Sequence, residues 1–306
     1  MLVISDSDIL DGQDYRVLSE ELKKQFIKLV RGVSKNLYRT RLETRQGILD
    51  LMGGVDEEDR VGSVKQYFYG QNIDFLISLF STDNSEILAI FPGKKVTRIR
   101  TAAASALATD ILSRKDSSVL GCIGAGYQAS EQVKAISQVR SIRRVIVSDI
   151  SEARLRRFKD TIEEQLGIET LAEKRVNSSF RGADIIVTAT TSSTPVIGNE
   201  FVRDDCYINS IGSFTPGMRE IERSTICESG IVAVDSLQET SKNTGEIMDA
   251  ISSGCLERDD INQFTDLVSG KIRSRKSAER TGSYFKSIGV GVEDLAVAKY
   301  LYSKFS

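Results

Sequence analysis

VLGCIGAGYQASEQVKAI, residues 119–136, joins a short apolar strand to a glycine-rich turn and an amphipathic helix. The turn has the pattern G-x-G-x-x-A, in which Gly124 permits a tight turn and Gly126 lets the backbone approach a phosphate. Ala129 allows close packing of helix on strand, and the helix N-terminus offers N–H donors at the positive end of its dipole. We therefore predict a dinucleotide pyrophosphate site formed by Gly124, Ala125, Gly126, Tyr127, Gln128 and Ala129.

The second predicted strand, RRVIVSD, ends in an acid at the position where dinucleotide folds bind a ribose. Asp149 comes 20 residues after Ala129, the spacing of the acid that binds the ribose 2′-hydroxyl. A carboxylate there repels a 2′-phosphate, so Asp149, with Ile150 beside it, favours NAD over NADP. The alternative is a glycine turn of another α/β fold, with Asp149 capping the next helix. The nicotinamide side is expected at strand ends that hold Thr190, Ser210, Ile211 and Gly212.

From residue 119 onward, short apolar runs alternate with longer amphipathic stretches. The runs are VLGCI, RRVIVSD, DIIVTAT, CYINSI and GIVAVDS. This alternation is typical of βαβ units around a parallel sheet that is buried on both faces. We predict an α/β fold with a Rossmann-type doubly wound parallel sheet in residues 115–281.

The residues before the glycine turn have the pattern of a mixed α+β unit. Leu18, Leu22 and Phe26 recur at helical spacing, and VGSVKQYFYG, FLISLFS and EILAIF have the composition of antiparallel strands. After Thr281 the run SYFKSIGVGVEDLAVAKYLYSKF is expected to be helical and to return to this unit. We predict that residues 1–114 and 282–306 together form the second domain.

Composition excludes several classes of function. The 306 residues include 41 Lys plus Arg and 43 Asp plus Glu, a net charge of −2 that does not suggest a nucleic-acid or membrane-surface protein. There is no histidine, so Ser-His-Asp and Cys-His catalysis are excluded. None of the four cysteines belongs to a C-x-x-C pair, which makes a metal site unexpected. With no basic, apolar leader at the N-terminus, we expect a reduced, cytoplasmic, soluble protein.

Several co-linear motifs carry a family resemblance along essentially the whole chain. They are RTAAASALA with GAGYQA, YRTRL, VGSVKQYFY, IGSFTPGMREI, VDS, TGEI and FKSIGVGVEDLA. Together they resemble the ornithine cyclodeaminase and mu-crystallin family. The resemblance implies a homodimer in which the domain of residues 1–114 and 282–306 binds substrate and dimerises, while residues 115–281 bind NAD. It also implies hydride transfer between nicotinamide and the α-carbon of an amino or imino acid.

The resemblance assigns candidate residues by motif. Arg39 matches the substrate arginine, Lys65 the substrate lysine, and Arg100, followed by Thr101, the arginine that touches both substrate and cofactor. An α-carboxylate needs a guanidinium or paired cations, which agrees with this set. Exposed surface is the alternative for Arg39, because Arg41 stands beside it. Lys286 and Gly289 match a segment that closes over the ligands, with Lys286 on the cofactor side.

Two departures from the cyclodeaminase pattern bear on the reaction. The aspartate that transfers protons in cyclodeaminases is Phe214 here, and a lysine usual four residues later is Met218. Asp50 lies where those enzymes have a second carboxylate that holds a substrate amine, although an ordinary turn aspartate is equally expected there. Asp235, after a strand, is a reserve acid–base candidate for which capping is the more usual role. The segment after Lys65 is also shorter than in the family.

We therefore expect an NADH-dependent reductase of a small cyclic ketimine such as a pyrroline-2-carboxylate. A reductase has less need of the missing aspartate, since an imine can arrive already protonated. Lys65 is the remaining proton donor. The alternatives are an ornithine cyclodeaminase that makes proline and ammonia, an opine-like amino acid dehydrogenase, and a non-enzymatic protein whose ligand binding is gated by a dinucleotide.

Overall fold

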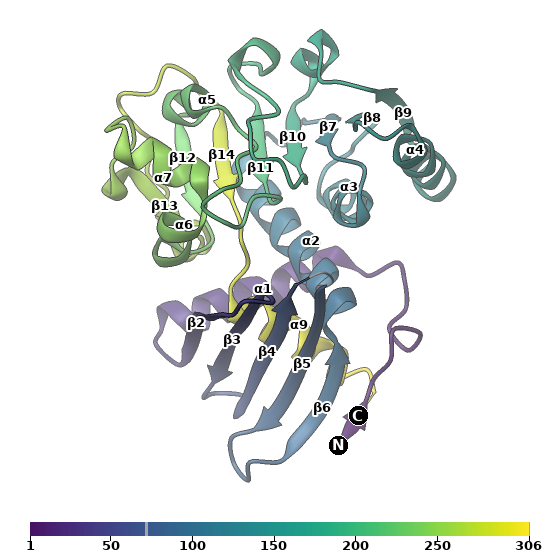
Figure 1. The fold of residues 1–306 in the computed structure, drawn as a ribbon, viewed down its shortest axis with the longest axis vertical. Coiled ribbons are helices and arrows are strands. Elements are labelled where there is room, and N and C mark those ends of the chain that lie inside the picture. The colour runs from purple at the N-terminus through teal and green to yellow at the C-terminus, as the bar shows by residue number, and fades with distance from the viewer. Residues whose placement is uncertain (71–72, 306) are drawn as a thin grey trace. The chain divides into compact units, whose positions relative to one another are not determined.

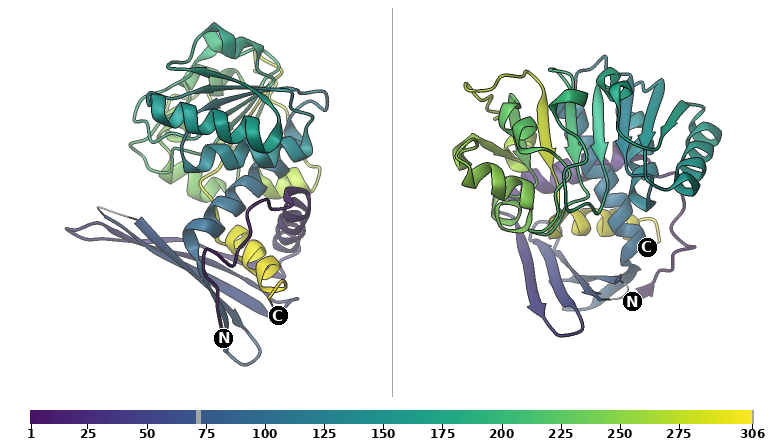
Figure 2. Two further views of the ribbon diagram at one scale, coloured as in Figure 1. Left: turned by 90° about the vertical axis from the view of Figure 1, so that its right-hand side faces the viewer. Right: turned by 45° about the horizontal axis from the view of Figure 1, so that its top comes forward.

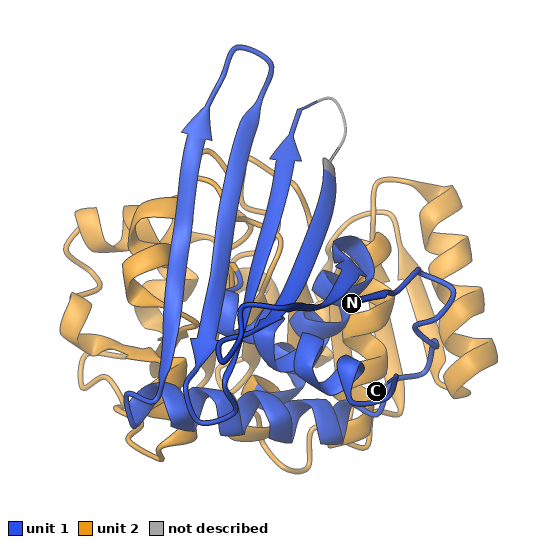
Figure 3. Ribbon diagram, turned by 90° about the horizontal axis from the view of Figure 1, so that it is seen from below, with its two compact units in different colours: residues 1–107, 289–306 blue, residues 108–288 orange. Residues whose placement is uncertain are grey.

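The computed structural model describes residues 1–70 and 73–305 and divides into two compact units (Figure 3). Unit 1 comprises Met1–Leu107 and Gly289–Ser306, and unit 2 comprises Ala108–Ile288. The sequence places these boundaries after residues 114 and 281. In the structure a helix of residues 93–112 runs through the first boundary, so no break in the chain marks it. Gln71 and Asn72, in the segment expected to be short, lie outside the described residues.

Unit 1 is built on a sheet with the strand order β1-β6-β5-β4-β3-β2 (Figure 1). Strand β1 is parallel to β6, and the other neighbours are antiparallel, as expected for β4, β5 and β6. The elements of unit 1 are β1 (Leu2–Val3), α1 (Tyr15–Val30), β2 (Ser34–Glu43), β3 (Ile48–Asp56), β4 (Val61–Tyr69), β5 (Ile73–Ser81), β6 (Ile87–Pro92), α9 (Gly291–Tyr302) and most of α2 (Gly93–Leu112).

The two faces of this sheet differ because side chains alternate along each strand. Lys65 and Tyr67 of β4 pair with Met52 and Asp50 of β3, and all four residues are buried. Phe68, the next residue on β4, points to the other face and is exposed. Helix α9 packs on β2, β3, β4 and β5, and α1 packs on α9 and β2, so both helices lie on the buried face (Figure 2, left). That face therefore carries charged side chains into the interior of unit 1.

One carboxylate joins both helices to the sheet. Asp56 of β3 is fully buried and accepts hydrogen bonds from Lys28 of α1 at 3.0 Å and Lys299 of α9 at 2.7 Å. Burial raises the pKa of Asp56, but the hydrogen bonds from Lys299, the Asp59 backbone and Lys28 outweigh it and hold the pKa below the ordinary 3.8. The ionised carboxylate thus stabilises the fold above pH 3.8 and loses that effect as the pH falls further.

Asp56→Asn is expected to lower the free energy of unfolding by about 3 kcal/mol at pH 7, because the ammonium groups of Lys28 and Lys299 lose their buried counter-charge and keep only the more exposed carboxylates of Asp59 and Glu58. Urea denaturation at pH 7 and pH 3 measures this, and the difference between variant and wild type should shrink at pH 3. Glu57→Gln, which breaks only an exposed pair with Lys35, is the control and should change stability by less than about 1 kcal/mol. Equal effects of the two variants would contradict the prediction.

Unit 2 is built on a parallel sheet with the order β13-β12-β14-β11-β10-β7-β8-β9. Its strands are β7 (Val119–Ile123), β8 (Arg144–Ser148), β9 (Glu169–Glu173), β10 (Ile185–Thr188), β11 (Tyr207–Ser210), β12 (Ile231–Val234), β13 (Ile261–Gln263) and β14 (Ser283–Lys286). Its helices are α3 (Tyr127–Val139), α4 (Glu152–Leu166), α5 (Arg223–Glu228), α6 (Leu237–Asn243), α7 (Gly245–Ser252) and α8 (Phe264–Val268), with short 3₁₀ helices η1 (Ser178–Gly182), η2 (Asn199–Phe201) and η3 (Arg258–Asp260).

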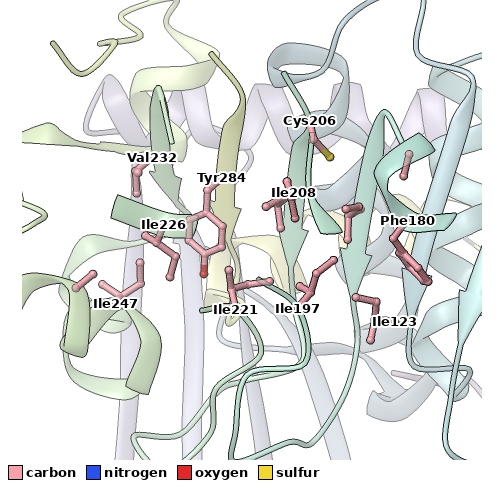
Figure 4. Close-up of a cluster of buried hydrophobic side chains, with 14 of the residues drawn as sticks. Ile123, Phe180, Ile197, Cys206, Ile208, Ile221, Ile226, Val232, Ile247 and Tyr284 are labelled. Carbon is pink, nitrogen blue, oxygen red and sulfur yellow. The ribbon is translucent and has the colours of Figure 1, made fainter. Parts of the chain in front are cut away.

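The strand order confirms the predicted doubly wound sheet. The chain runs from β7 outward through β8 to β9, then returns to β10 on the other side of β7, so the direction of winding reverses between β7 and β10. Ligands of such folds bind at this reversal, at the carboxyl ends of the strands. A hydrophobic cluster that includes Ile123, Phe180, Ile208 and Tyr284 fixes one face of the sheet (Figure 4). The glycine turn therefore directly follows a strand whose last residue, Ile123, packs in this cluster.

Two sequence expectations are wrong. Ser283–Lys286, expected to begin the C-terminal helix, is strand β14 between β11 and β12, and the helix begins only at Gly291. Cys227 and Cys255, expected to be reduced, form a disulfide with a Cα–Cα distance of 5.5 Å. Their spacing of 28 residues gives no hint of this, because packing of the segments that hold them, rather than local sequence, brings the two together.

The described residues contain neither a helix that could span a membrane nor a cluster of metal-binding side chains. None of their helices combines the length and apolar character needed to span a bilayer. Within the same residues, no three His, Cys, Asp or Glu side chains form a group that could hold a metal ion.

Candidate functional site

The glycine turn of unit 2 has the geometry that a pyrophosphate requires. Gly124 has φ +96°, and a Cβ there would lie 2.6 Å from the Ala189 carbonyl oxygen, so a side chain is excluded. A Cβ on Gly126 would meet no atom within 4 Å, which leaves open space in front of the turn and the N-terminus of α3. Ala129 is fully buried. The residues present thus fit the predicted dinucleotide.

Asp149 follows β8, where the sequence predicts the ribose ligand. Its carboxylate accepts hydrogen bonds from the backbone N–H groups of Ala125 and Ser151, each at 2.8 Å, and from Nη2 of Arg154 at 2.8 Å. Burial raises the pKa of Asp149, but the bonds from Arg154 and the two backbone N–H groups outweigh it and lower the pKa. Asp149 therefore stays ionised, joins the glycine turn to α4, and is paired with an arginine that sequence analysis did not select. Ile150 beside it is 90% exposed.

A cavity of about 600 Å³ lies in unit 2 at the reversal of the sheet. The structure brings Gly124, Gly126, Asp149, Ile150 and Thr190 together in its wall. The cavity is also lined by three basic side chains that the sequence did not point to, Arg154, Lys174 and Arg175. The other predicted residues of the dinucleotide fold lie beside these: Ala125 in the glycine turn, Tyr127, Gln128 and Ala129 at the start of α3, Ser210 at the end of β11, and Ile211 and Gly212 directly after it.

A buried carboxylate, Glu220, holds two of these strand ends together. Its Oε1 accepts hydrogen bonds from the backbone N–H of Thr190 at 2.6 Å and from the Thr190 hydroxyl at 2.9 Å. Its Oε2 accepts from the backbone N–H groups of Gly212 at 2.7 Å and Ser213 at 3.0 Å. One side chain therefore sets the loops after β10 and β11. No pattern in the sequence singles out Glu220 as an individual residue, although it lies in the motif IGSFTPGMREI.

Lys286 has partners other than a cofactor. Its ammonium group is fully buried, 3.0 Å from Glu246 and 2.6 Å from the Ser213 hydroxyl. Glu246 also accepts from the hydroxyl of Tyr284 at 3.0 Å. Burial raises the pKa of Glu246, but Lys286 and the hydrogen bonds outweigh it and lower the pKa to about 2. In this structure Lys286 therefore neutralises a carboxylate beneath the loop after β11.

Asp235, the reserve acid–base candidate, is bound by backbone and hydroxyl groups of unit 2. Its Oδ2 accepts from the backbone N–H of Ile288 at 2.7 Å and the hydroxyl of Ser287 at 3.1 Å. Its Oδ1 accepts from the backbone N–H of Ser236 at 2.7 Å. It belongs to unit 2, whereas Lys65 belongs to unit 1. The N-cap of the following helix α6 is Ser236, so these contacts join Asp235 to the segment after β14 instead of capping α6.

The three predicted substrate cations form a buried cluster in unit 1, which we call the cation cluster: Arg39 of β2, Lys65 of β4 and Arg100 of α2. The side chains of Arg39, Lys65 and Arg100 are only 5%, 2% and 7% exposed. The exposed-surface alternative for Arg39 is therefore wrong. Three cations buried together are costly unless carboxylates or a ligand anion neutralise them.

Two carboxylates from α9 meet this cluster. Asp294 Oδ1 lies 3.5 Å from Lys65 Nζ and 3.4 Å from Arg100 Nε, and Glu293 Oε2 accepts a hydrogen bond from Arg100 Nη1 at 3.0 Å. Burial lowers the pKa of Lys65 to about 7; Asp294 opposes this, while Arg100 and Arg39 reinforce it. Lys65 can therefore give up a proton near neutral pH, which an ordinary lysine does not. No motif in the sequence points to a role for either carboxylate.

Asp50 is committed to other protein groups. It accepts two hydrogen bonds from Arg41, both at 2.9 Å, and one from Tyr67 at 2.8 Å, while Arg39 Nε lies 3.9 Å away. Burial raises the pKa of Asp50, but Arg41 and Tyr67 outweigh it and lower the pKa. Asp50 lies in strand β3 rather than in the turn that was its alternative. Its carboxylate thus orients the neighbourhood of Arg39 and stays ionised.

The remaining candidates, Thr101, Gly289 and Phe214, add no charged side chain to either site. Thr101 donates its hydroxyl to the Thr97 carbonyl within α2 at 2.7 Å. Gly289 has φ +81°, and a Cβ there would lie 2.2 Å from Arg100 Nη1. Glycine at this position therefore leaves room for the Arg100 guanidinium. Phe214 follows β11 in unit 2 and has no ionisable group.

The family model of the ornithine cyclodeaminase/mu-crystallin family matches residues 13–306. The chain is 34% identical over 235 residues to a Δ1-pyrroline-2-carboxylate reductase of Bacillus cereus, covering 76% of this chain and 72% of that protein. The solved Δ1-pyrroline-2-carboxylate reductase of Thermococcus litoralis in complex with NADH and L-proline has a TM-score of 0.92 and 30% identity, covering 99% of this chain and 97% of that one. An archaeal alanine dehydrogenase dimer with bound NAD has a TM-score of 0.88 and 27% identity, covering 99% and 95%.

These matches agree with the motifs that carry the resemblance and with the fold of both units. Family members of known structure extend over nearly the whole of this chain. The chain belongs to the ornithine cyclodeaminase/mu-crystallin family.

Proposed function

We propose that this protein is an NAD(H)-dependent reductase of a small cyclic ketimine, with a pyrroline-2-carboxylate as the best candidate substrate. The observation that carries the proposal is the buried Lys65, whose pKa of about 7 suits a proton donor, beside two arginines that suit a carboxylate. Unit 2 would bind the dinucleotide and unit 1 the imino acid. Relatives that reduce Δ1-pyrroline-2-carboxylate, and matched structures that hold NADH or NAD, support both assignments.

The reaction needs one hydride and one proton. The glycine turn and Asp149 of unit 2 would hold NADH, which would supply the hydride to the α-carbon. Lys65 donates the proton to the imine nitrogen, so the C=N bond becomes CH–NH and the lysine is left neutral. Arg39 and Arg100 bind the α-carboxylate and orient the imine, and a guanidinium fits a carboxylate in a bidentate manner. A substrate carboxylate would also add the negative charge that three clustered cations favour.

Phe214 argues against the cyclodeaminase alternative. That reaction oxidises the α-carbon of ornithine before it reduces the imine, and its proton relay uses an aspartate where this chain has phenylalanine. Asp50 is the carboxylate that the sequence offers in place of that aspartate, but in the structure it is bound to Arg41 and Tyr67. Nothing in the described site favours the opine-like or the non-enzymatic alternative over imine reduction.

A two-part assay tests the proposal. Purified protein is given NADH with pyrroline-2-carboxylate, and separately NAD with L-ornithine, while NADH absorbance and proline are followed. The expected result is loss of NADH with formation of proline from the imine alone. Proline and ammonia from ornithine with no net change in NADH would overturn the reductase in favour of the cyclodeaminase. Absence of turnover in both arms, with a ligand still bound, would favour the binding protein.

Asp294 raises the pKa of Lys65 against the effect of burial, so the rate is expected to depend on pH. As a proton donor Lys65 must be protonated, so kcat is expected to fall as the pH rises through about 7. Asp294→Asn removes the carboxylate that favours the protonated amine, so the falling limb should move to lower pH by at least about half a unit. The pH profile of kcat checks this, with Asp294→Glu expected to restore the limb. A wild-type profile that is flat from pH 6 to 9 would contradict it.

The face of the unit 1 sheet opposite α1 and α9 supports a homodimer. The archaeal alanine dehydrogenase with a similar structure is a dimer. Cross-strand pairs place a set of apolar side chains on the face opposite Lys65, half-buried or exposed: Leu42, Leu49, Leu51, Val64, Phe68 and Leu76. Contiguous apolar patches of this kind mark interfaces. Light scattering is expected to give a dimer for wild type and a monomer for the double variant Phe68→Glu, Leu76→Glu. A monomeric wild type would contradict the proposal.

A further inference from the structure

We propose that Glu220, Glu246 and Lys286, which we call the buried triad, carry one surplus negative charge that favours the oxidised, positively charged nicotinamide over the reduced one. This inference rests on the proposed function, in which the loops after β10 and β11 hold the nicotinamide. Hydride donation oxidises NADH to NAD⁺ and leaves a positive charge on the ring, while the imine C=N becomes CH–NH with the proton from Lys65. A fixed negative charge near the ring therefore stabilises bound NAD⁺ and the transition state of imine reduction.

Glu220 is bound to the two loops that are expected to hold the nicotinamide. Its Oε1 accepts the backbone N–H of Thr190 at 2.6 Å, and its Oε2 accepts the backbone N–H of Gly212 at 2.7 Å. Thr190 also lines the cavity of unit 2. A Cβ on Gly212 would lie 2.2 Å from the Thr190 carbonyl oxygen, so the two loops meet backbone to backbone. The carboxylate of Glu220 is therefore one hydrogen bond away from the wall of the cavity.

The charges of the buried triad do not cancel. All three side chains are 0% exposed, and Lys286 Nζ lies 3.0 Å from Glu246 and 3.9 Å from Glu220. Among the described residues, no other cation forms an ion pair with either carboxylate. Two carboxylates with one ammonium group leave one negative charge. The backbone N–H and hydroxyl groups that donate to the carboxylates stabilise this charge, but they do not neutralise it.

The negative charge of Glu220 acts as far as the strand before the glycine turn. Burial raises the pKa of the Cys122 thiol in β7 to about 12, and the negative charges of Asp149 and Glu220 reinforce this rise. Arg219, the neighbour of Glu220 in the chain, is paired with Asp249 and adds no net charge. The surplus charge is therefore felt at the carboxyl ends of the strands, in an interior where water screens it weakly.

Substitutions at two members of the triad separate charge from shape. The Kd of NADH is measured by its fluorescence without any imine, and the Kd of NAD⁺ by displacement of NADH. Glu220→Gln and Glu246→Gln each remove the surplus charge, so the ratio of the NAD⁺ Kd to the NADH Kd should rise at least about fivefold. Glu220→Asp keeps the charge but shortens the side chain, so it should weaken both forms and keep the ratio within about twofold of wild type.

Asp184→Asn is the matched control. Asp184 is also buried, and it accepts the backbone N–H groups of Ser118 and Val119 at 2.8 and 2.9 Å. It therefore joins strand ends in the same way as Glu220, but at the amino ends of β7 and β10, on the edge of the sheet opposite the cavity. The control should lower the temperature of unfolding and keep the ratio within about twofold of wild type.

Each other outcome decides against the inference. An unchanged ratio in either glutamine variant overturns it while leaving the reductase intact, and one folded variant suffices because each lacks one of the two carboxylates. An equal rise in Glu220→Asp or in Asp184→Asn also overturns it, because the effect then comes from shape and not from charge. Failure of wild type to bind either form overturns the proposed cofactor and this inference together. Imine turnover, measured separately, tests only the proposed reaction.

Discussion

Lys65→Met is expected to lower kcat for imine reduction by about 10²- to 10⁴-fold, the range that a positioned general acid contributes. The variant keeps the approximate length of the side chain but removes both the proton and the charge. The Lys65 side chain is 2% exposed and its Nζ lies 3.5 Å from Asp294, so water cannot readily replace it. Single-turnover rates with saturating NADH measure the effect. A kcat within threefold of wild type would contradict the assignment of Lys65 as donor.

A second substitution separates proton transfer from carboxylate binding. Lys65→Arg keeps the positive charge, but a guanidinium does not release its proton near neutral pH. Substrate affinity should therefore be retained within about tenfold while kcat falls as in Lys65→Met. Lys35→Met, a change to an exposed lysine of β2, controls for loss of charge and should leave kcat unchanged. Thermal unfolding of each variant shows whether any loss reflects the fold instead.

The fold was predictable wherever it depends on local spacing. The glycine turn, the alternating apolar runs and the motif set are all short-range patterns, and both the doubly wound sheet and the family prediction are confirmed. The strand Ser283–Lys286 was not predictable in the same way. It is four residues long and is followed closely by glycine and then a helix, so its sequence has no alternation to read. Only its position between β11 and β12 makes it a strand.

The candidate site was predictable for the cations but not for their carboxylate partners. Arg39, Lys65 and Arg100 lie in motifs that can be recognised in isolation. Asp294 contacts Lys65 from a distant part of the sequence, and an acid in the first turn of a helix is ordinarily explained by the helix dipole. Arg154 likewise looks like a solvated helix residue until the structure places it on Asp149. Ion pairs between residues far apart in the chain cannot be predicted from local sequence patterns.

Arg100→Met is expected to lower kcat/KM for the imine by about 10²- to 10³-fold, as expected when a buried charge-assisted pair loses one partner. Several contacts constrain the position of Arg100. Its Nη1 donates to Glu293 at 3.0 Å, its Nε lies 3.4 Å from Asp294, and Gly289 leaves room for its guanidinium. These contacts preorganise the group, so a carboxylate binds without the cost of ordering a flexible side chain.

Gly289→Ala tests the same idea without removing the charge. The added Cβ would lie 2.2 Å from Arg100 Nη1, so the guanidinium must move. The variant should lose at least about tenfold in kcat/KM for the imine, mostly through KM, while NADH binding to unit 2 is unchanged. Glu293→Gln, which keeps the shape beside Arg100 but not the charge, should lose less than Arg100→Met. If Arg100→Met and Gly289→Ala both keep wild-type KM, the substrate carboxylate binds elsewhere, and Arg100 serves only to neutralise the two acids of α9.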